Sequence, residues 1–232
     1  MSQTGIVLPP ATTSTRAEHV YATLKTEILG GVLRPGSRLR VVELADRFSV
    51  SQTVVREALT RLAEQRIVEA APQQGYRVAP LTLADLNALT ETRVFVEGQA
   101  LRLAVIRGDV SWETEVVAAH HQLTRTEPLD EDGAIRTAWL DAHEAFHASL
   151  FAGCGNHRLL HVAANLRDAA ALYRIWSRPL GDGGHRDLPS EHRGLLDAVL
   201  ARDPDLAAER LAHHIQRTSA VLVAVAEREE EP

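Results

Sequence analysis

The feature that most constrains this chain is the spacing of its apolar side chains, which follows the period of an α-helix from Arg16 almost to the C-terminus. Val20, Leu24 and Ile28 begin the pattern, and each falls on the same side of a helix as the one before it. Aromatic residues make up only 4% of the 232 residues. This composition suits helical packing better than a β-sandwich or barrel, and the sequence predicts a mainly α-helical fold.

The helical period is interrupted near residues 65–80, and this interruption marks the end of a small N-terminal unit. Helices are predicted from Arg16 to the Gly30-Gly31 pair, over residues 41–48 and over residues 51–64. Two short strands, 67–71 and 76–79, are predicted on either side of a Pro-Gln-Gln-Gly turn. These elements predict a domain over residues 15–80, preceded by a disordered tail over residues 1–14 that is rich in Pro, Ser and Thr.

The helices at 41–48 and 51–64 have the layout of a helix-turn-helix. In that motif the second helix enters the major groove of DNA, and its N-terminal residues meet the base edges. Gln, Ser and Thr can hydrogen-bond to bases, Arg can reach guanine or phosphate, and a glycine at the hairpin tip permits close approach to DNA. The candidate DNA-binding residues are Arg38, Arg40, Ser51, Gln52, Thr53, Arg56 and Gly75. The alternative is that they are only the exposed faces of a small helical domain.

Beyond Pro80 the whole chain is predicted to be helical. Gly153, Gly155 and the Asp203-Pro204 pair mark element boundaries. Helices are expected at about 83–107, 111–126, 132–152, 156–177, 186–201 and 204–227, followed by a frayed acidic tail. Short connections between six helices predict an antiparallel bundle over residues 81–228.

Four histidines are expected to point into this bundle. His143 and His147 share a helical stripe with Trp139 and Leu150, and His192 and His214 lie on apolar stripes of two later helices. Four imidazoles that converge in a bundle core can hold a divalent metal ion. The remaining bundle histidines lack this facing and are predicted to lie on the surface: His120, His121, His157, His161, His185 and His213.

Two alternatives to a regulatory metal site remain open. The segment from His143 to His147 fits the H-E-x-x-H motif of zinc proteases, which would make the chain a metal-dependent hydrolase. Glu144 lies about 100° around the helix from His143, which disfavours that interpretation. The other alternative is a module whose histidines only pack the core and bind no metal.

Charge and cysteine content limit the class of protein. The net charge is −6, yet residues 1–80 contain 10 Lys and Arg against 7 Asp and Glu, which suggests a polyanionic partner for this part alone. No stretch approaches the roughly 18 apolar residues of a membrane span, and the N-terminus lacks the pattern of a signal peptide. The single cysteine, Cys154, cannot form an internal disulfide. We therefore expect a cytoplasmic protein with no membrane partner.

The first unit resembles the winged helix-turn-helix of the GntR family of bacterial transcription regulators. The resemblance covers residues 33–80, and its most specific part is VSQTVVREALTRL, residues 50–62. Family members usually have Arg where this chain has Gln52 and often Pro where it has Val54. The resemblance implies a regulator that binds a double-stranded DNA operator.

The second unit resembles the FCD ligand-binding domain of the FadR-like branch of this family, over about residues 83–226. The resemblance rests on residues 83–101, which include Asp85, Arg93 and Glu97, on residues 146–160, and on residues 191–215. It implies that the metal ligands are His143, His147, His192 and His214, with His143 in the place of the usual Asp. An all-imidazole set carries no negative charge and favours Zn²⁺, or Ni²⁺, over Mg²⁺ or Ca²⁺.

The same resemblance implies a homodimer controlled by a small organic acid. A metal ion with open positions can bind one carboxylate, and a nearby arginine can hold a second anionic group. The candidate effector-binding residues are Arg93, Arg102 and Arg174.

Overall fold

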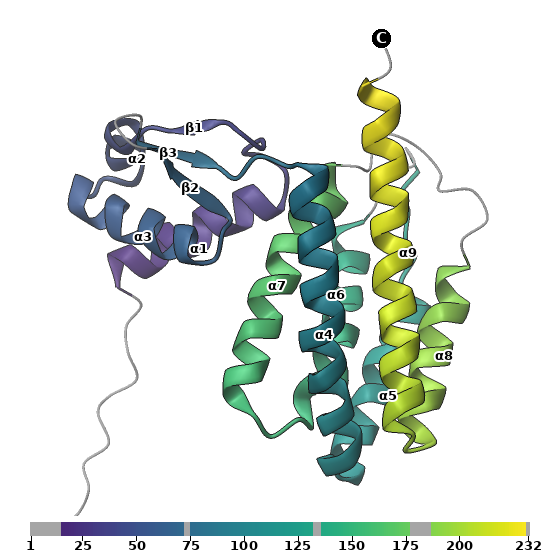
Figure 1. Ribbon diagram of the computed structural model, residues 1–232. Helices are drawn as coiled ribbons and strands as arrows, with labels where there is room; N and C mark the ends of the chain where they lie inside the picture. Colours follow the sequence, from purple (N-terminus) through teal and green to yellow (C-terminus); the bar gives the residue numbers. More distant parts are fainter. Residues whose placement is uncertain (1–14, 72–74, 132–135, 177–186, 231–232) are drawn as a thin grey trace, which may run out of the picture. The chain divides into compact units, whose positions relative to one another are not determined.

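Helices dominate the structure, as the sequence predicts. The computed structural model describes residues 15–71, 75–131, 136–176 and 187–230, which form nine helices and three short strands (Figure 1). The chain divides into two compact units, Met1–Leu81 and Thr82–Pro232. The predicted tail at residues 1–14 lies outside the described residues, so its prediction is untested.

The first unit contains α1 (Arg16–Leu29), α2 (Val41–Phe48) and α3 (Gln52–Glu64), followed by β2 (Val68–Ala71) and β3 (Gly75–Val78). Val20, Leu24 and Ile28 of α1 are fully buried, whereas Tyr21, which belongs to the same predicted stripe, is only partly buried. The predicted stripe of α3 is fully buried and consists of Val55, Ala58, Leu59 and Leu62. The two helices pack against each other. A left-handed residue, Ser49 with φ of 53°, ends α2 and turns the chain toward α3. The helix-turn-helix layout is therefore present.

The sheet of the first unit has one strand more than predicted. β1 (Arg38–Leu39) pairs antiparallel with β3, which lies between β1 and β2. Arg38 faces Arg77 in this register, and Leu39 faces Tyr76. Two residues are too few for an alternating pattern to appear in the sequence, so only the pairing partner reveals this strand.

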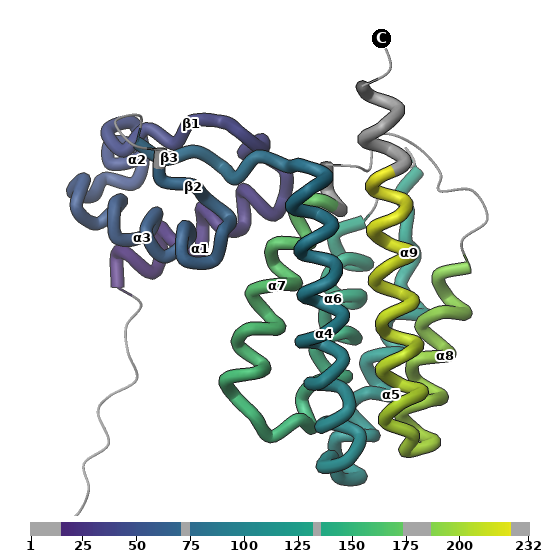
Figure 2. The backbone as a smooth tube through the Cα atoms, in the orientation of Figure 1, coloured from purple at the N-terminus to yellow at the C-terminus, as the bar shows by residue number. Residues whose placement is uncertain are grey.

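The second unit is the predicted bundle of six antiparallel helices: α4 (Leu83–Arg107), α5 (Val110–Arg125), α6 (Thr137–Ala152), α7 (His157–Trp176), α8 (Leu188–Leu200) and α9 (Pro204–Glu230). The helices α4 and α9 run side by side in opposite directions (Figure 2). α4 also packs on α7, α5 packs on α6 and α8, and α8 packs on α9.

The predicted and observed helix boundaries differ most at α6 and α9. α6 begins at Thr137 instead of residue 132, and residues 132–135 lie outside the described residues. α9 continues to Glu230, although the acidic end was expected to fray after about residue 227. The starts of α4, α5 and α8 are capped by Thr82, Asp109 and Asp187, whose side-chain oxygens accept backbone N–H bonds.

The core of the bundle is apolar and is built from every helix that carries one of the four histidines. Phe146 and Leu150 of α6, Leu195 of α8 and Leu211 of α9 are fully buried in it. No helix in the described part of the chain has both the length and the apolar character needed to span a membrane.

Candidate metal centre and nucleic-acid interface

The predicted DNA-reading helix is built as its sequence suggests. Ser51 caps α3, and its hydroxyl accepts the backbone N–H of Val54 at 3.4 Å. The apolar stripe is fully buried, whereas Gln52, Thr53 and Arg56 are exposed on the opposite side. α3 therefore presents a polar, cationic face that no other described residue of its unit covers.

The other candidate DNA-binding residues lie around the sheet. Arg38 is exposed on β1, and Arg40 forms an exposed ion pair with Glu43 at 2.8 Å. Gly75 begins β3 with φ of +85°, a conformation that other residues adopt only with strain. Tyr76 links this strand to α3, because its hydroxyl lies 3.2 Å from Thr60 Oγ1. The strand that carries Gly75 is thus tied to the exposed helix.

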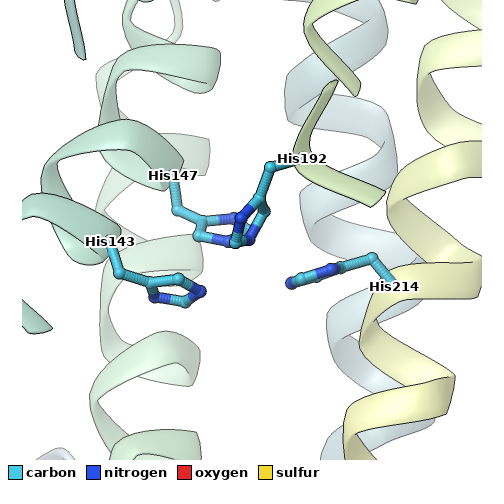
Figure 3. A group of neighbouring side chains, drawn as sticks. All are labelled: His143, His147, His192 and His214. Carbon is cyan, nitrogen blue, oxygen red and sulfur yellow. The ribbon is translucent and has the colours of Figure 1, made fainter. Parts of the chain in front are cut away.

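In the bundle, the four predicted histidines meet. Each offers one ring nitrogen, and the four atoms lie within 4.8 Å of one another (Figure 3). All four side chains are buried, with 3–9% of their surface exposed. The ring centroids of His143 and His147 are 4.5 Å apart, and those of His147 and His214 are 4.9 Å apart. His192 completes the group at 5.0 Å from both His143 and His214.

The positions of the four rings follow from helix geometry. His143 and His147 are one turn apart on α6 and therefore project from the same side. The ring of Trp139, one turn earlier, stacks on His143 at 5.0 Å. His192 and His214 lie on the buried stripes of α8 and α9, next to Leu195 and Leu211 in the core. Three helices that bury one core thus bring the imidazoles together.

Two glutamates lie next to this group in the sequence, and their environments differ. Glu191 is almost buried, and its Oε2 is 2.9 Å from Nδ1 of His214. Glu144 is about half exposed and accepts a hydrogen bond from Nε of Arg167 at 3.0 Å. Sequence reasoning missed the contact of Glu191, because it joins two helices and depends on their packing.

One surface prediction is wrong. His120 is only 4% exposed, packs edge-on against Phe146, and has no hydrogen-bond partner for Nε2 among the described residues. Burial lowers the pKa of His120, and the nearby charge of Arg193 adds to this effect. The helical stripe of Trp112, Val116 and Leu123 contains position 120 and was the signal for burial. Three of the others, His121, His157 and His161, are exposed, as is His213, and His185 lies outside the described residues.

The three arginines predicted to bind an effector have different surroundings. Arg93 is buried, and its Nε and Nη2 donate to the two carboxylate oxygens of Glu97 at 2.6 and 3.3 Å. Arg102 is partly exposed and pairs with Asp205, and the side chain of Arg174 lies outside the described residues.

Arg93 also lines a small cavity between α4, α7 and α9. The other lining residues are Leu86, Leu89, Thr90, Ala170, Thr218, Ser219 and Leu222. The hydroxyls of Thr90 and Ser219 lie 2.6 Å apart, and Thr218 donates to the backbone carbonyl of His214. Its walls are mostly apolar with a few hydroxyls and one arginine, and it has room for about one water molecule.

Comparisons with known proteins agree with this architecture. Residues 16–78 match the family "Bacterial regulatory proteins, gntR family", and residues 88–217 match the family "FCD domain". The HTH-type transcriptional repressor GlaR of Escherichia coli (strain K12) is 36% identical over 84% of this chain and 90% of its own length. An uncharacterized HTH-type transcriptional regulator, BphR of Paraburkholderia xenovorans (strain LB400), is 31% identical over 93% of this chain and 88% of its own length.

A solved structure has the same fold. The structure described as E. coli McbR/YncC matches with a TM-score of 0.74 at 23% identity, over 91% of this chain and 99% of that one. These families and relatives are regulators of transcription and not enzymes, so the hydrolase alternative for His143 to His147 is set aside. The chain belongs to the GntR family of bacterial DNA-binding transcriptional regulators, in the group whose second domain is an FCD domain.

Proposed function

We propose that this regulator binds an inverted-repeat operator as a homodimer and is controlled by a small carboxylate effector beside a divalent metal ion in its bundle. The observation that supports this proposal most is the buried group of four imidazoles from three helices. Burying polar side chains costs free energy unless they are hydrogen-bonded or bind a ligand, so four imidazoles together in an apolar core favour a common ligand. The metal is Zn²⁺, with Ni²⁺ as the second candidate.

The donor set fits such an ion. His143, His147, His192 and His214 would hold it, because neutral imidazoles are good ligands for Zn²⁺ and Ni²⁺. Two nitrogens bound to one tetrahedral Zn²⁺ are about 3.4 Å apart, so nitrogen separations that now reach 4.8 Å must shrink by up to about 1.4 Å. When bound, the ion would supply a Lewis-acidic position for a carboxylate oxygen as a fifth ligand.

We place the effector site at the cavity lined by Arg93, which must widen to hold more than about one water molecule. It reaches Thr218, which is one helical turn from His214 on α9. Arg93 would bind a carboxylate through the guanidinium edge that Glu97 leaves open, and the hydroxyls of Thr90 and Ser219 would bind further oxygens. Arg102 and Arg174 stay predictions, since Arg102 does not line this cavity.

The DNA-binding roles are assigned to the exposed side of α3 and its neighbours. Gln52, Thr53 and Arg56 would meet base edges, Ser51 would bind a phosphate besides capping the helix, and Arg38 and Arg40 would hold the backbone. Gly75 would let the hairpin approach the minor groove. A two-fold dimer reads a two-fold site, which is why we expect an inverted repeat. Because GlaR is named a repressor, repression is the favoured direction.

The metal is tested by elemental analysis of protein purified without chelator or metal-affinity resin. We expect close to one ion per chain in the wild type and a loss of this ion in His192→Ala. His213→Ala is the matched control, because His213 is exposed and next to His214 in the sequence. A wild-type protein with far less than one ion per chain, even after incubation with Zn²⁺, would leave the four histidines as core packing.

The operator and the dimer are tested separately. Sequencing of DNA fragments selected by the full-length protein should give an inverted repeat, and light scattering should give the mass of a dimer. Selected sites without two-fold symmetry, or a monomer that binds its site with full affinity, would contradict this part of the proposal.

A further inference from the structure

The carboxylate of Glu191 is nearly buried and lies in hydrogen-bond contact with one ring of the four-histidine group. Its Oε2 lies 2.9 Å from Nδ1 of His214, and only 10% and 7% of these two side chains are exposed. Glu191 lies in the first turn of α8, where the helix dipole favours a negative charge. The contact joins α8 to α9.

This contact determines which nitrogen His214 offers to its neighbours. An ionised carboxylate can only accept a hydrogen bond, so Nδ1 of His214 carries the proton and donates it. A neutral ring then has its lone pair on Nε2, on the far side from Glu191. Figure 3 shows a nitrogen at the tip of the His214 ring that points toward the other three histidines. We infer that Glu191 is a positioning residue that holds His214 as the Nε2 ligand of a divalent cation; this inference rests on the proposed metal site.

Glu191 also supplies charge that the ligand set lacks. Four neutral imidazoles leave both positive charges of a divalent ion uncompensated in an apolar core, and burying an unpaired charge is costly. The carboxylate of Glu191 would offset part of this charge through its hydrogen bond to His214. Its other oxygen is 3.5 Å from Nε of Arg217, whose side chain is 45% exposed and therefore screened by water. Arg217 competes only weakly for the charge of Glu191.

Glu144 offers a control within the same group. It follows His143 directly in the sequence, as Glu191 precedes His192. Its carboxylate is paired with Arg167 and about half exposed. Substitution of Glu144 therefore removes an acidic side chain beside the ligands without removing the hydrogen bond to His214.

The experiment measures Zn²⁺ affinity by competition with a chromophoric chelator, using full-length protein stripped of metal. Loss of an outer-shell carboxylate lowers metal affinity by about 10- to 100-fold, and we expect this range for Glu191→Gln and at least as much for Glu191→Ala. Glu144→Gln and Arg217→Gln should stay within about threefold of the wild type, since neither changes the His214 contact. With Co²⁺ as the probe, Glu191→Ala should also shift the visible absorption bands, which report the ligand geometry.

The outcomes separate this inference from the proposal beneath it. If the wild type binds no Zn²⁺, the metal site itself fails. If the wild type binds but Glu191→Gln and Glu191→Ala bind equally well, only the role of Glu191 is overturned. If either variant does not fold, histidine ¹⁵N spectra of the Zn²⁺-loaded wild type decide the question: a protonated Nδ1 on His214 supports the inference, and a protonated Nε2 overturns it.

Discussion

Arg93 and Glu97 form a buried ion pair on α4, and removing either partner should strongly destabilise the second unit. Glu97 is completely buried and Arg93 nearly so, and the two are joined by a two-point contact at 2.6 and 3.3 Å. Glu97→Ala leaves the guanidinium buried without its counter-charge. We expect the free energy of unfolding to fall by about 3–5 kcal/mol, the range for breaking one side of a buried pair.

This loss converts into a measurable shift in melting temperature. For a unit of about 150 residues, each kcal/mol corresponds to roughly 2–4 °C, so Glu97→Ala should lower the Tm by about 6–20 °C. All three tryptophans, Trp112, Trp139 and Trp176, belong to the second unit. Urea unfolding followed by tryptophan fluorescence therefore reports on this unit alone.

Two variants check the physical reason. Asp205→Asn on α9 breaks the exposed pair with Arg102 of α4. It should lower the free energy of unfolding by less than about 1 kcal/mol, because water screens both groups. Replacing both buried partners, by Arg93→Met together with Glu97→Leu, should recover most of the stability lost in Glu97→Ala. A cost below about 1 kcal/mol for Glu97→Ala, or a double variant no more stable than the single one, would refute the argument.

Three further predictions concern DNA, pH and metal. Arg56→Ala should weaken operator binding by roughly 1–3 kcal/mol in a titration at fixed salt and leave the fold intact, because Arg56 lies off the buried stripe of α3. Burial lowers the pKa of His120 in the folded state, so the unfolded chain takes up the proton first and stability falls as the pH drops below about 6.5. His120→Leu should flatten this fall in metal-free urea titrations, whereas the exposed His121→Leu should leave it unchanged. Chelation should lower the Tm of the second unit, by the equivalent of about 2.7 kcal/mol if free metal stood at 100 times its Kd, and no change on chelation would argue against a bound ion.

Much of the fold could be predicted from the sequence, because it depends on interactions between residues close together in the chain. Helix positions follow from the spacing of apolar residues and from caps such as Ser51 and Asp109, which act within one turn of chain. The same spacing brought His143 and His147 to one face and indicated that His192 and His214 point inward. This spacing does not reveal β1, which is too short for a pattern, and the prediction that His120 lies on the surface is wrong, because His120 shares the buried stripe of α5.

Contacts between helices were decided only by the tertiary structure. The period of a helix tells which face is buried, but it does not tell which side chain of a second helix lies opposite. The bond from Glu191 to His214 joins residues on α8 and α9, and the cavity beside Arg93 forms where α4, α7 and α9 meet. The sequence by itself thus determined the two units, the exposed face of α3 and the four inward-facing histidines. The packing of the bundle decided that the four rings lie close together and that the nearly buried carboxylate of Glu191 contacts one of them, because both depend on the distances between helices.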